Sequence, residues 1–370
     1  MRKFTFASGH ASRVARNGGR DSGEQNIPVA GMAARLATFA HAAPCPAEIS
    51  VVIPTFRRPY FLQRCLAALL RQDLDPRRFE IIVCDDEPRE TTRTLVACYT
   101  AMAETRGLAV TYLPVKGHHG PAAARNRGWR AATGNVIAFT DDDAMPDPQW
   151  LLAGLAAMAA PDVAAASGRI EVPLPAAPTD YELDAAGLER AEFSTANCFV
   201  RRSMLEKVGG FDERYAAAWR EDSDLQFSIL SAGGLIVRAD TARVVRPVRA
   251  ARWGISLAET AKSRFDALLF KKHRELYRRR IAATAPRTYY VMVCSLAAAA
   301  IAASVGFTTA ALYALTPWIG LTALFAAARL RGTTHRPFHV LEMVWTSMLI
   351  PPLAIVWRLY GAWKFRVRFL

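Results

Sequence analysis

The hydrophobic pattern from Ile49 to about Ala250 alternates short apolar runs with amphipathic stretches. Four apolar runs without polar alternation are typical of buried strands in a parallel sheet: Ile49–Ile53, Glu80–Cys84, Ala109–Leu113 and Asn135–Thr140. Three intervening segments show helical spacing: Tyr60–Arg71, Arg89–Thr105 and Pro121–Ala132. Strands that alternate with helices predict an α/β domain with a mostly parallel sheet.

The C-terminal part of the chain is far more apolar. No charged residue occurs from Thr288 to Ala328, and a membrane-spanning helix needs about 20 residues. This stretch therefore predicts two transmembrane helices with a tight turn near Gly306. A further apolar stretch, Phe338–Trp357, contains Glu342 and the pair Pro351-Pro352, so residues 288–370 hold two or three apolar segments.

Positive charge marks the segment between these two regions. The formal net charge is +14, and much of the basic excess lies between Arg243 and Arg287, directly before the apolar region. That placement favours anionic membrane lipid as a partner over nucleic acid. Residues 251–287 are therefore predicted to form basic amphipathic juxtamembrane helices on the membrane surface. The alternative is a solvated helix that packs on the α/β domain.

These patterns divide the chain into four regions: a poorly ordered leader at 1–47, the α/β domain at 48–250, the juxtamembrane helices at 251–287 and the membrane region at 288–370. The six cysteines include no C-x-x-C pair, so the sequence indicates neither a zinc site nor a disulfide framework. This pattern is typical of a protein in a reducing compartment.

The distribution of basic residues predicts an orientation in the membrane. The positive-inside rule places both the segment before Thr288 and the basic loop Arg329–Arg336 in the cytoplasm. Because the tail after Trp357 is also basic, the third apolar stretch is either re-entrant or interfacial, or the tail is an exception to the rule. We expect a multi-pass protein of the inner (cytoplasmic) membrane, with its α/β domain facing the cytoplasm.

Acidic residues cluster where predicted strands end, and open α/β sheets bind ligands beyond the carboxyl ends of their strands. Asp141, Asp142 and Asp143 directly follow an apolar strand. Asp141 and Asp143 can point to the same face and form a hard oxygen site for Mg²⁺ or Mn²⁺. Such a metal would neutralise charge that develops on a leaving diphosphate. The alternative is a turn, because aspartate is common at strand ends.

Two further acidic pairs carry possible chemistry. Asp85-Asp86 ends the preceding α/β unit, where a carboxylate can hydrogen-bond a base or ribose, and the alternative is an N-cap for the helix after Pro88. Glu221-Asp222 heads a helical segment, where a carboxylate can act as the general base for an acceptor hydroxyl, and the alternative is helix capping. Arg125 and Arg127 can face a phosphate or nucleobase, whereas His118-His119 is typical of a polar loop.

Six motifs in a fixed order resemble the family 2 glycosyltransferases. They are Ile49–Phe56 (ISVVIPTF), Val83–Asp86 (VCDD), Gly120–Gly128 (GPAAARNRG), Phe139–Asp143 (FTDDD, with the D-x-D pattern), Asn197–Arg202 (NCFVRR) with Val208–Glu213 (VGGFDE), and Glu221-Asp222. The resemblance covers roughly residues 49–250. It implies a Rossmann-like GT-A fold, a nucleotide-diphosphate sugar donor that is commonly a UDP-sugar, and single-displacement transfer with inversion at the anomeric carbon.

The same resemblance implies roles for individual residues. The donor site would contain Pro54, Thr55, Asp85, Asp86, Arg125, Asp141 and Asp142. Asp143 together with Asp141 would hold the metal. Asp222 would be the general base with Glu221 as its competitor, and Asn197 and Trp219 would lie on the acceptor side.

Two departures from the family pattern narrow the prediction. Many members carry a metal- or diphosphate-binding histidine after the E-D motif, and here Arg246 stands in that region and can supply positive charge instead. Processive polymer-forming members carry Q-x-x-R-W, of which Arg249–Trp253 keeps only the last two positions. We therefore predict transfer of one sugar to a lipid-linked or membrane-proximal saccharide acceptor during synthesis of a cell-envelope polysaccharide.

Two rival functions remain from the sequence. A nucleotidyltransferase also combines an α/β sheet with paired aspartates, but its Gly-rich first loop is absent because Pro54–Arg58 stands in that place. A catalytically inactive, membrane-anchored protein that binds sugar nucleotides is the non-enzyme alternative, and the intact acidic motifs argue against it.

Overall fold

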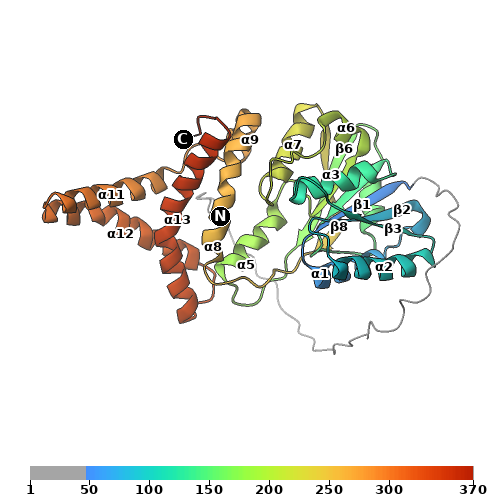
Figure 1. Cartoon of the computed structure of the whole chain (residues 1–370), viewed down its shortest axis with the longest axis horizontal. Helices are drawn as coiled ribbons and strands as arrows, with labels where there is room; N and C mark the ends of the chain where they lie inside the picture. Colours follow the sequence, from blue (N-terminus) through green and yellow to red (C-terminus); the bar gives the residue numbers. More distant parts are fainter. Residues whose placement is uncertain (1–46, 370) are drawn as a thin grey trace. The chain divides into compact units, whose positions relative to one another are not determined.

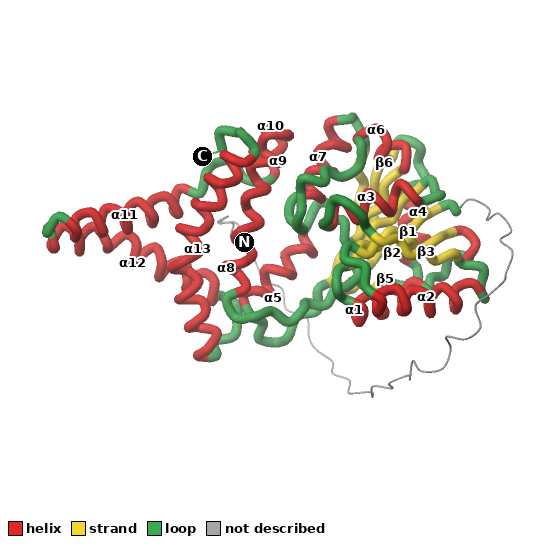
Figure 2. Tube along the Cα trace, in the orientation of Figure 1, coloured by secondary structure: helices red, strands yellow, loops and turns green. Residues whose placement is uncertain are grey.

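A computed structural model describes residues 47–369, so the predicted leader at 1–47 lies outside the described residues except for Ala47. The described chain contains one eight-stranded sheet with helices on both faces, followed by a helical C-terminal region (Figure 1, Figure 2). The strands are β1 (Ile49–Thr55), β2 (Phe79–Asp85), β3 (Ala109–Pro114), β4 (Val136–Thr140), β5 (Met145–Pro146), β6 (Val163–Glu171), β7 (Asn197–Arg201) and β8 (Leu235–Val245).

Helices fall into two groups along the chain. Those of the α/β domain are α1 (Pro59–Leu69), α2 (Glu90–Glu104), α3 (Pro121–Ala131), α4 (Trp150–Ala157), α5 (Asp180–Ala185), α6 (Arg202–Val208) and α7 (Glu221–Ser231), with short 3₁₀ helices η1 (Pro76–Arg78) and η2 (Ala186–Arg190). Those of the C-terminal region are α8 (Ile255–Thr260), η3 (Ala261–Phe265), α9 (Asp266–Lys272), α10 (Arg274–Arg280), α11 (Arg287–Ser304), α12 (Thr308–Leu330) and α13 (Pro337–Lys364).

The sheet has the order β3-β2-β1-β4-β7-β6-β8-β5 and is mixed. Strands β3, β2, β1 and β4 are parallel, β7 runs antiparallel between β4 and β6, and β8 pairs parallel with β6 and antiparallel with β5. The four predicted strands and three predicted helices are confirmed to within a few residues. The parallel half therefore brings the carboxyl ends of β1, β2 and β4 to one edge of the sheet.

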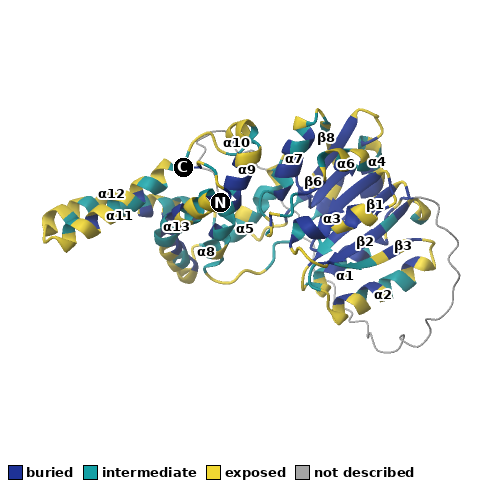
Figure 3. Cartoon of the chain, turned by 45° about the horizontal axis from the view of Figure 1, so that its top comes forward, coloured by how far each residue is buried: buried dark blue, intermediate teal, exposed yellow. Residues whose placement is uncertain are grey.

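Two apolar clusters lie on opposite faces of this sheet, because side chains alternate along each strand (Figure 3). Val51 of β1 packs in the cluster that includes residues of α1 and α2, whereas the next residue, Val52, packs in the cluster with Trp129 of α3. Burying both faces explains the continuous apolar runs that predict these strands. The sheet is thus a rigid platform for the loops at its carboxyl edge.

The basic helices before the membrane region bury their apolar side against protein. Phe265, Leu268 and Leu269 are at most 1% exposed and form a third apolar cluster with Tyr215, Phe227 of α7 and two phenylalanines of the C-terminal tail. The structure therefore favours packing on the α/β domain, the alternative weighed for this segment, over an apolar face laid on lipid. Only the basic side of these helices is left for solvent or headgroups.

Three helices are long and apolar enough to cross a membrane: α11, α12 and α13. α11 and α12 pack against each other as a hairpin whose turn contains Gly306 at φ +84°, so the predicted turn is confirmed. The third apolar stretch forms one helix of 28 residues that continues through Pro351 and Pro352. These helices expose many large apolar side chains, which indicates association with a membrane.

Candidate active site

Most of the predicted donor-site residues meet at the carboxyl edge of the parallel strands. Thr55 at the end of β1 pairs in register with Asp85 at the end of β2. The Thr55 Oγ1 hydroxyl donates a hydrogen bond of 2.8 Å to Asp142 Oδ2, which follows β4. Pro54 lies next to Thr55 on β1. The ends of β1, β2 and β4, which carry the three predicted motifs, therefore lie together as the sequence indicates.

Both carboxylates of the first acidic pair are engaged within the protein. Asp85 is fully buried and accepts hydrogen bonds from the Tyr112 hydroxyl at 2.9 Å and from backbone amides at the entry to α2. Burial raises its pKa, although these hydrogen bonds oppose the rise. Asp86 accepts two bonds, at 2.8 and 3.0 Å, from the Gly120 amide. This pair therefore links β2 to the start of α3.

No other residue type fits in place of Gly120 at the start of α3. Its φ is +114°, and a Cβ atom would lie 2.9 Å from the carbonyl oxygen of Ala216. The chain can thus pass Asp86 closely only with glycine at this position, which explains the glycine that opens the G-P-A-A-A-R-N-R-G motif.

Asp142, at the centre of the D-x-D motif, points into the protein. Its side chain is 2% exposed, and besides Thr55 it contacts Arg58 Nη1 at 3.2 Å. Burial raises its pKa to about 6, although the Arg58 guanidinium opposes this rise. Asp142 therefore anchors the loop after β4, while Asp143 is equally buried and Asp141 is partly exposed.

The two predicted metal ligands, Asp141 and Asp143, are both paired with arginines. Arg125 Nη2 donates to Asp141 Oδ1 at 2.8 Å. Arg246 donates from Nε and Nη2 to the two oxygens of Asp143 at 2.8 and 3.2 Å, and Arg249 Nε lies 3.1 Å from Asp143 Oδ2. Burial opposes ionisation of Asp141, but the neighbouring guanidinium groups hold its pKa below its ordinary value.

The donor chemistry of these two carboxylates fits a divalent cation, because Mg²⁺ and similar ions take one or two carboxylates plus substrate phosphates. No group of three His, Cys, Asp or Glu residues converges as a metal site within the part of the chain that the structure describes. A cation at Asp143 would require Arg246 and Arg249 to turn away from its oxygens. The residues therefore suit a metal that arrives with a diphosphate better than a permanently bound one.

Arg125 connects this edge to the second acidic pair. It is 3% exposed, and its Nη1 lies 3.3 Å from Glu221 Oε1 at the first turn of α7, while its Nη2 holds Asp141. Burial raises the pKa of Glu221 to about 7, and the adjacent Asp222 adds to this rise. Glu221 Oε2 is buried without a hydrogen-bond partner among the described residues.

Asp222 is more accessible than Glu221 and is held at the helix N-terminus. Its Oδ1 accepts a 2.6 Å hydrogen bond from the Ser223 amide, and burial raises its pKa. The residue before the helix, Arg220, has φ +74° and is fixed by a 2.6 Å contact to Asp266 Oδ1 of α9. The contact with α9 therefore holds the residue directly before α7.

Comparison with known proteins adds family membership to this geometry. Residues 50–209 match the family model described as glycosyl transferase family 2. The α/β domain belongs to this family. The match spans the edge with the D-x-D motif and ends before Glu221, so the second acidic pair rests on the resemblance described above.

Related proteins share parts of this glycosyltransferase domain. Glycosyltransferase AglE of Haloferax volcanii is 26% identical over 172 residues, which cover 44% of this chain and 55% of that protein. Validoxylamine A glucosyltransferase of Streptomyces hygroscopicus subsp. limoneus is 37% identical over 113 residues, or 30% of this chain and 24% of that protein. The chain thus spans about half or less of the length of these relatives.

A solved structure shares the fold over a longer stretch. The mannosyltransferase PcManGT from Pyrobaculum calidifontis, in complex with GDP-Man and Mn²⁺, superposes with a TM-score of 0.51 at 20% identity, and the match covers 87% of this chain and 90% of that chain. This likeness confirms the predicted GT-A fold class with C-terminal helices.

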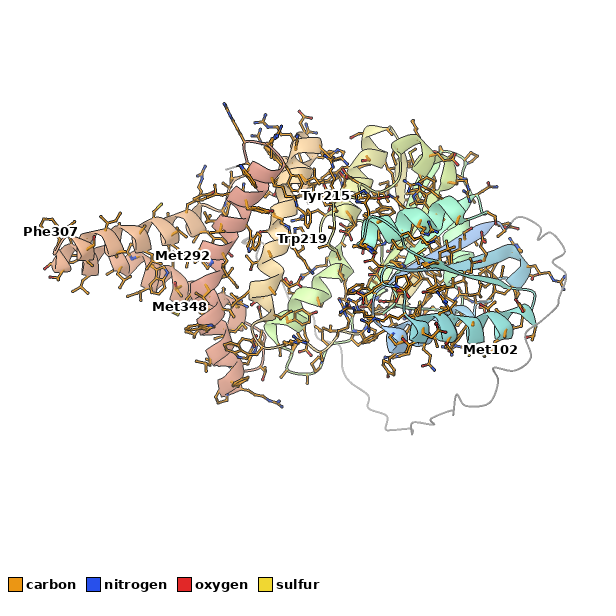
Figure 4. All side chains as sticks on the ribbon, in the orientation of Figure 1. Met102, Tyr215, Trp219, Met292, Phe307 and Met348 are labelled. Carbon is orange, nitrogen blue, oxygen red and sulfur yellow. The ribbon has the colours of Figure 1, made fainter. Side chains whose placement is uncertain are left out.

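The two predicted acceptor-side residues of the glycosyltransferase domain are tied into the protein. Asn197 is fully buried, accepts from Trp150 Nε1 at 2.8 Å and donates to the carbonyl groups of Arg169 and Ala242. This arrangement indicates a role in joining β7 to β6 and β8. Trp219 is half-buried and donates from Nε1 to Asp266 at 3.0 Å (Figure 4).

Sequence reasoning missed several residues of this site. Arg58, Arg249 and Asp266 neutralise or position the predicted carboxylates, yet none belongs to the six motifs that carry the family resemblance. Arg249 stands at the first position of the altered Q-x-x-R-W pattern, which is the one signal in the sequence that points to it. Arg127, expected near a phosphate, instead lines a separate cavity of about 450 Å³ between α3 and the loop after β3.

Proposed function

We propose that the chain transfers one sugar from a nucleotide-diphosphate sugar to a lipid-linked or membrane-proximal saccharide acceptor, with inversion at the anomeric carbon. The observation that carries the proposal is the buried network in which Arg125 joins Asp141, at the end of β4, to Glu221, at the start of α7. This network places a candidate donor-binding carboxylate and a candidate base on either side of one guanidinium group.

The donor would bind at the edge formed by β1, β2 and β4, with its nucleoside near Thr55 and Asp86. The sequence favours a UDP-sugar, whereas the solved neighbour holds GDP-Man, so both nucleotides belong in a donor test. Asp141 and Asp143 would hold a Mg²⁺ or Mn²⁺ ion, which when bound neutralises the charge of the leaving diphosphate. Arg246 and Arg249, released from Asp143, are free to contact the same anion.

Asp222 is the better candidate for the general base. It is less buried than Glu221, and burial raises its pKa, which makes its carboxylate a stronger base. In the proposed step, the acceptor hydroxyl gives its proton to Asp222, its oxygen bonds to the anomeric carbon, and the bond from that carbon to the diphosphate oxygen breaks. Glu221 would instead position Arg125, which it contacts directly.

A membrane location agrees with this chemistry. The C-terminal helices expose apolar side chains, and α12 is tied to the start of α5 because Arg329 Nη2 contacts Asp180 Oδ2 at 2.8 Å. The segment around α5 follows the glycosyltransferase motifs that bind the donor in the resemblance, so an acceptor bound there would lie next to the membrane helices. We propose the inner (cytoplasmic) membrane, with the domain on the cytoplasmic side.

A donor screen tests the proposal. Purified full-length protein would be incubated with UDP- and GDP-sugars, Mn²⁺ or Mg²⁺, and a membrane extract as acceptor, and products would be identified by mass spectrometry. Release of a nucleoside diphosphate together with a sugar-bearing lipid is the expected result. Pyrophosphate as product would indicate a nucleotidyltransferase, and donor binding without turnover would indicate an inactive binding protein.

A further inference from the structure

The last helix, α13, buries one side against protein and exposes large apolar side chains in its first and last parts. One face is buried against protein and includes His339, Met343, Thr346, Ser347, Ile350, Ile355 and Gly361. The other face carries large exposed apolar side chains: Phe338, Leu341, Val344, Trp345, Val356, Leu359, Tyr360 and Trp363. These side chains form two groups, at 338–345 and 356–363, that lie largely on one side of the helix, whereas no residue from 346 to 355 is exposed. Exposed apolar groups of this size need an apolar partner outside the chain.

Contacts with α12 show that α13 crosses the base of the α11–α12 hairpin. Arg329, in the last turn of α12, donates from Nη1 to the hydroxyls of Thr346 and Ser347, near the middle of α13. A helix that returned alongside α12 would instead bring its first residues to this point. In Figure 4, Phe307 marks the far tip of the hairpin, whereas Met348 lies on α13 at the hairpin's base.

Contacts with the juxtamembrane helices run along the rest of α13. Glu342 Oε1 accepts a 2.6 Å hydrogen bond from the Gly254 amide, which precedes α8. Further along, Gly361 packs on the backbone of Arg264 in η3, and the Phe365 carbonyl accepts a bond of 2.9 Å from Lys271 of α9. α13 therefore runs parallel to and beside α8, η3 and α9 from its first turns to its end (Figure 1).

This neighbour makes a transmembrane path for α13 costly. α9 is fixed to the glycosyltransferase domain, because Asp266 contacts Arg220 and Lys272 contacts Asp224 at 2.7 Å. If α13 crossed the bilayer, the charged segment α8–η3, which runs beside it and is continuous with α9, would be drawn toward the hydrocarbon, where charged side chains are disfavoured. With 28 residues, α13 would also be about 42 Å long, against a hydrocarbon thickness of about 30 Å.

The exposed aromatic residues of α13 also favour a location at the membrane interface. Transmembrane helices place tryptophan and tyrosine at their ends, at the depth of the headgroups. On α13, Trp345 lies within the helix and Tyr360 and Trp363 lie near its end, all on the exposed face. A helix that lies in the interface plane keeps all three at headgroup depth.

We propose that α13 lies in the plane of the membrane interface, with its apolar face at the boundary between phospholipid headgroups and acyl chains, and that the α11–α12 hairpin alone enters the hydrocarbon. The basic residues Lys364, Arg366 and Arg368 then stay on the same side of the membrane as the basic segment before α11. This placement removes the conflict with the positive-inside rule that three full spans create. The proposal does not depend on which sugar the domain transfers.

A consequence is that the membrane surface positions the candidate base. α13 packs on η3 and α9, and Asp266 at the start of α9 holds Arg220, the residue directly before Glu221 and Asp222. A helix that floats at constant depth would hold this site at a constant height above the bilayer. Such a device suits an acceptor whose reacting group is presented at the headgroups.

Spin-label depth measurements on the full-length protein in phospholipid vesicles test the proposal. Single cysteines replace Phe338, Trp345, Val356 and Trp363 on the exposed face of α13, and Ile319 in α12 serves as the hairpin control. The background variant carries serine at Cys45, Cys98 and Cys294, and it keeps the fully buried Cys65, Cys84 and Cys198. The accessibility of each nitroxide to oxygen and to a water-soluble nickel complex gives its depth.

The four α13 labels should lie within about 5–10 Å of the headgroup boundary with no trend along the helix, whereas the Ile319 label should lie deep. A cytoplasmic location of a reporter fused after Leu370 should accompany this profile. A V-shaped profile, with Trp345 and Val356 deep and both ends shallow, would overturn the proposal. So would a reporter that is active only outside the cytoplasm.

Discussion

Glu221 is the residue whose environment makes the sharpest quantitative prediction. Burial raises the pKa of its carboxyl group from 4.5 to about 7, so the folded protein holds this proton after the unfolded chain has released it. Stability therefore falls as pH rises from about 4.5 to about 7, because the ionised form is disfavoured in the folded state. The full penalty is about 3 kcal/mol, since each pH unit of displacement corresponds to 1.36 kcal/mol.

The substitution Glu221→Gln removes the titration but keeps an oxygen that can accept from Arg125. The difference in unfolding free energy between wild type and variant should move by roughly 2–3 kcal/mol in favour of the variant between pH 5 and pH 8. For a domain of this size, that change corresponds to roughly 5–10 °C in melting temperature. Taking the difference between the two proteins cancels the titration of groups that do not interact with Glu221, whereas Asp222 beside it contributes to the difference.

The assay is thermal unfolding of both proteins in detergent at half-unit steps of pH, followed by circular dichroism. Glu275→Gln is the control, because that carboxylate lies on the exposed surface of α10 and its 4.0 Å pair with Arg279 is open to solvent. The control should show no comparable slope. If the Glu221→Gln difference is flat between pH 5 and pH 8, the assignment of a protonated buried carboxyl group is refuted.

Three further changes probe the rest of the site. Asp143→Asn should lower turnover roughly 100-fold at a fixed metal concentration, because the ion that offsets the charge of the leaving diphosphate is held less tightly, and excess Mn²⁺ should restore part of the activity. Wild-type turnover at every metal concentration in a steady-state assay would show that the residue is not a ligand. Asp266→Asn frees Arg220 and should lower kcat about 10-fold with little change in the KM for donor, so a change in KM alone would argue against its positioning role. Gly120→Ala should lower the free energy of unfolding by roughly 1–3 kcal/mol and weaken donor binding. Gly117→Ala should lower it less, because Gly117 also has a positive φ but a Cβ there would meet no atom within 4 Å. Equal losses in the two variants would mean that the contact between residue 120 and the Ala216 backbone does not matter.

The parallel half of the sheet could be predicted because its information is local. Strands such as β1 and β4 are buried on both faces and read as continuous apolar runs, with helical spacing between them. The strands of the antiparallel half have weaker hydrophobic patterns in the sequence. β6 contains the small residues Ala164, Ala165 and Ala166, and β8 interleaves polar with apolar positions, so neither resembles the first strands. The insertion of β7 between β4 and β6 depends on pairing between distant segments, which periodicity does not report.

In the candidate site, too, the features with a local sequence signal could be predicted, and those that depend on contacts between distant segments could not. The acidic residues could be found because they occupy strand ends and a helix start, which motifs mark in the sequence. Their partners could not, because Arg58, Arg246 and Arg249 come from separate loops that only the folded sheet brings to the aspartates. The raised pKa of Glu221 likewise depends on burial, which no local pattern reports.

The juxtamembrane helices show a limit of amphipathic patterns. The spacing of Phe265, Leu268 and Leu269 indicates one apolar face, and that face exists. Lipid and a protein surface satisfy such a face equally well, because both remove it from water. Contacts with Tyr215 and Phe227 show that protein covers this face, whereas exposed apolar side chains lie on α13.

The central claim is sugar transfer with Asp222 as the base, and one comparison tests it most directly. Wild type, Asp222→Asn and Asp240→Asn would be assayed with the donor found in the screen, and transferred sugar would be measured in the lipid extract. Asp240 is an exposed carboxylate on β8 that pairs with Arg238, so its variant should keep wild-type turnover. Asp222→Asn should bind donor normally and transfer at least about 100-fold more slowly. Full transfer activity in Asp222→Asn would contradict the account.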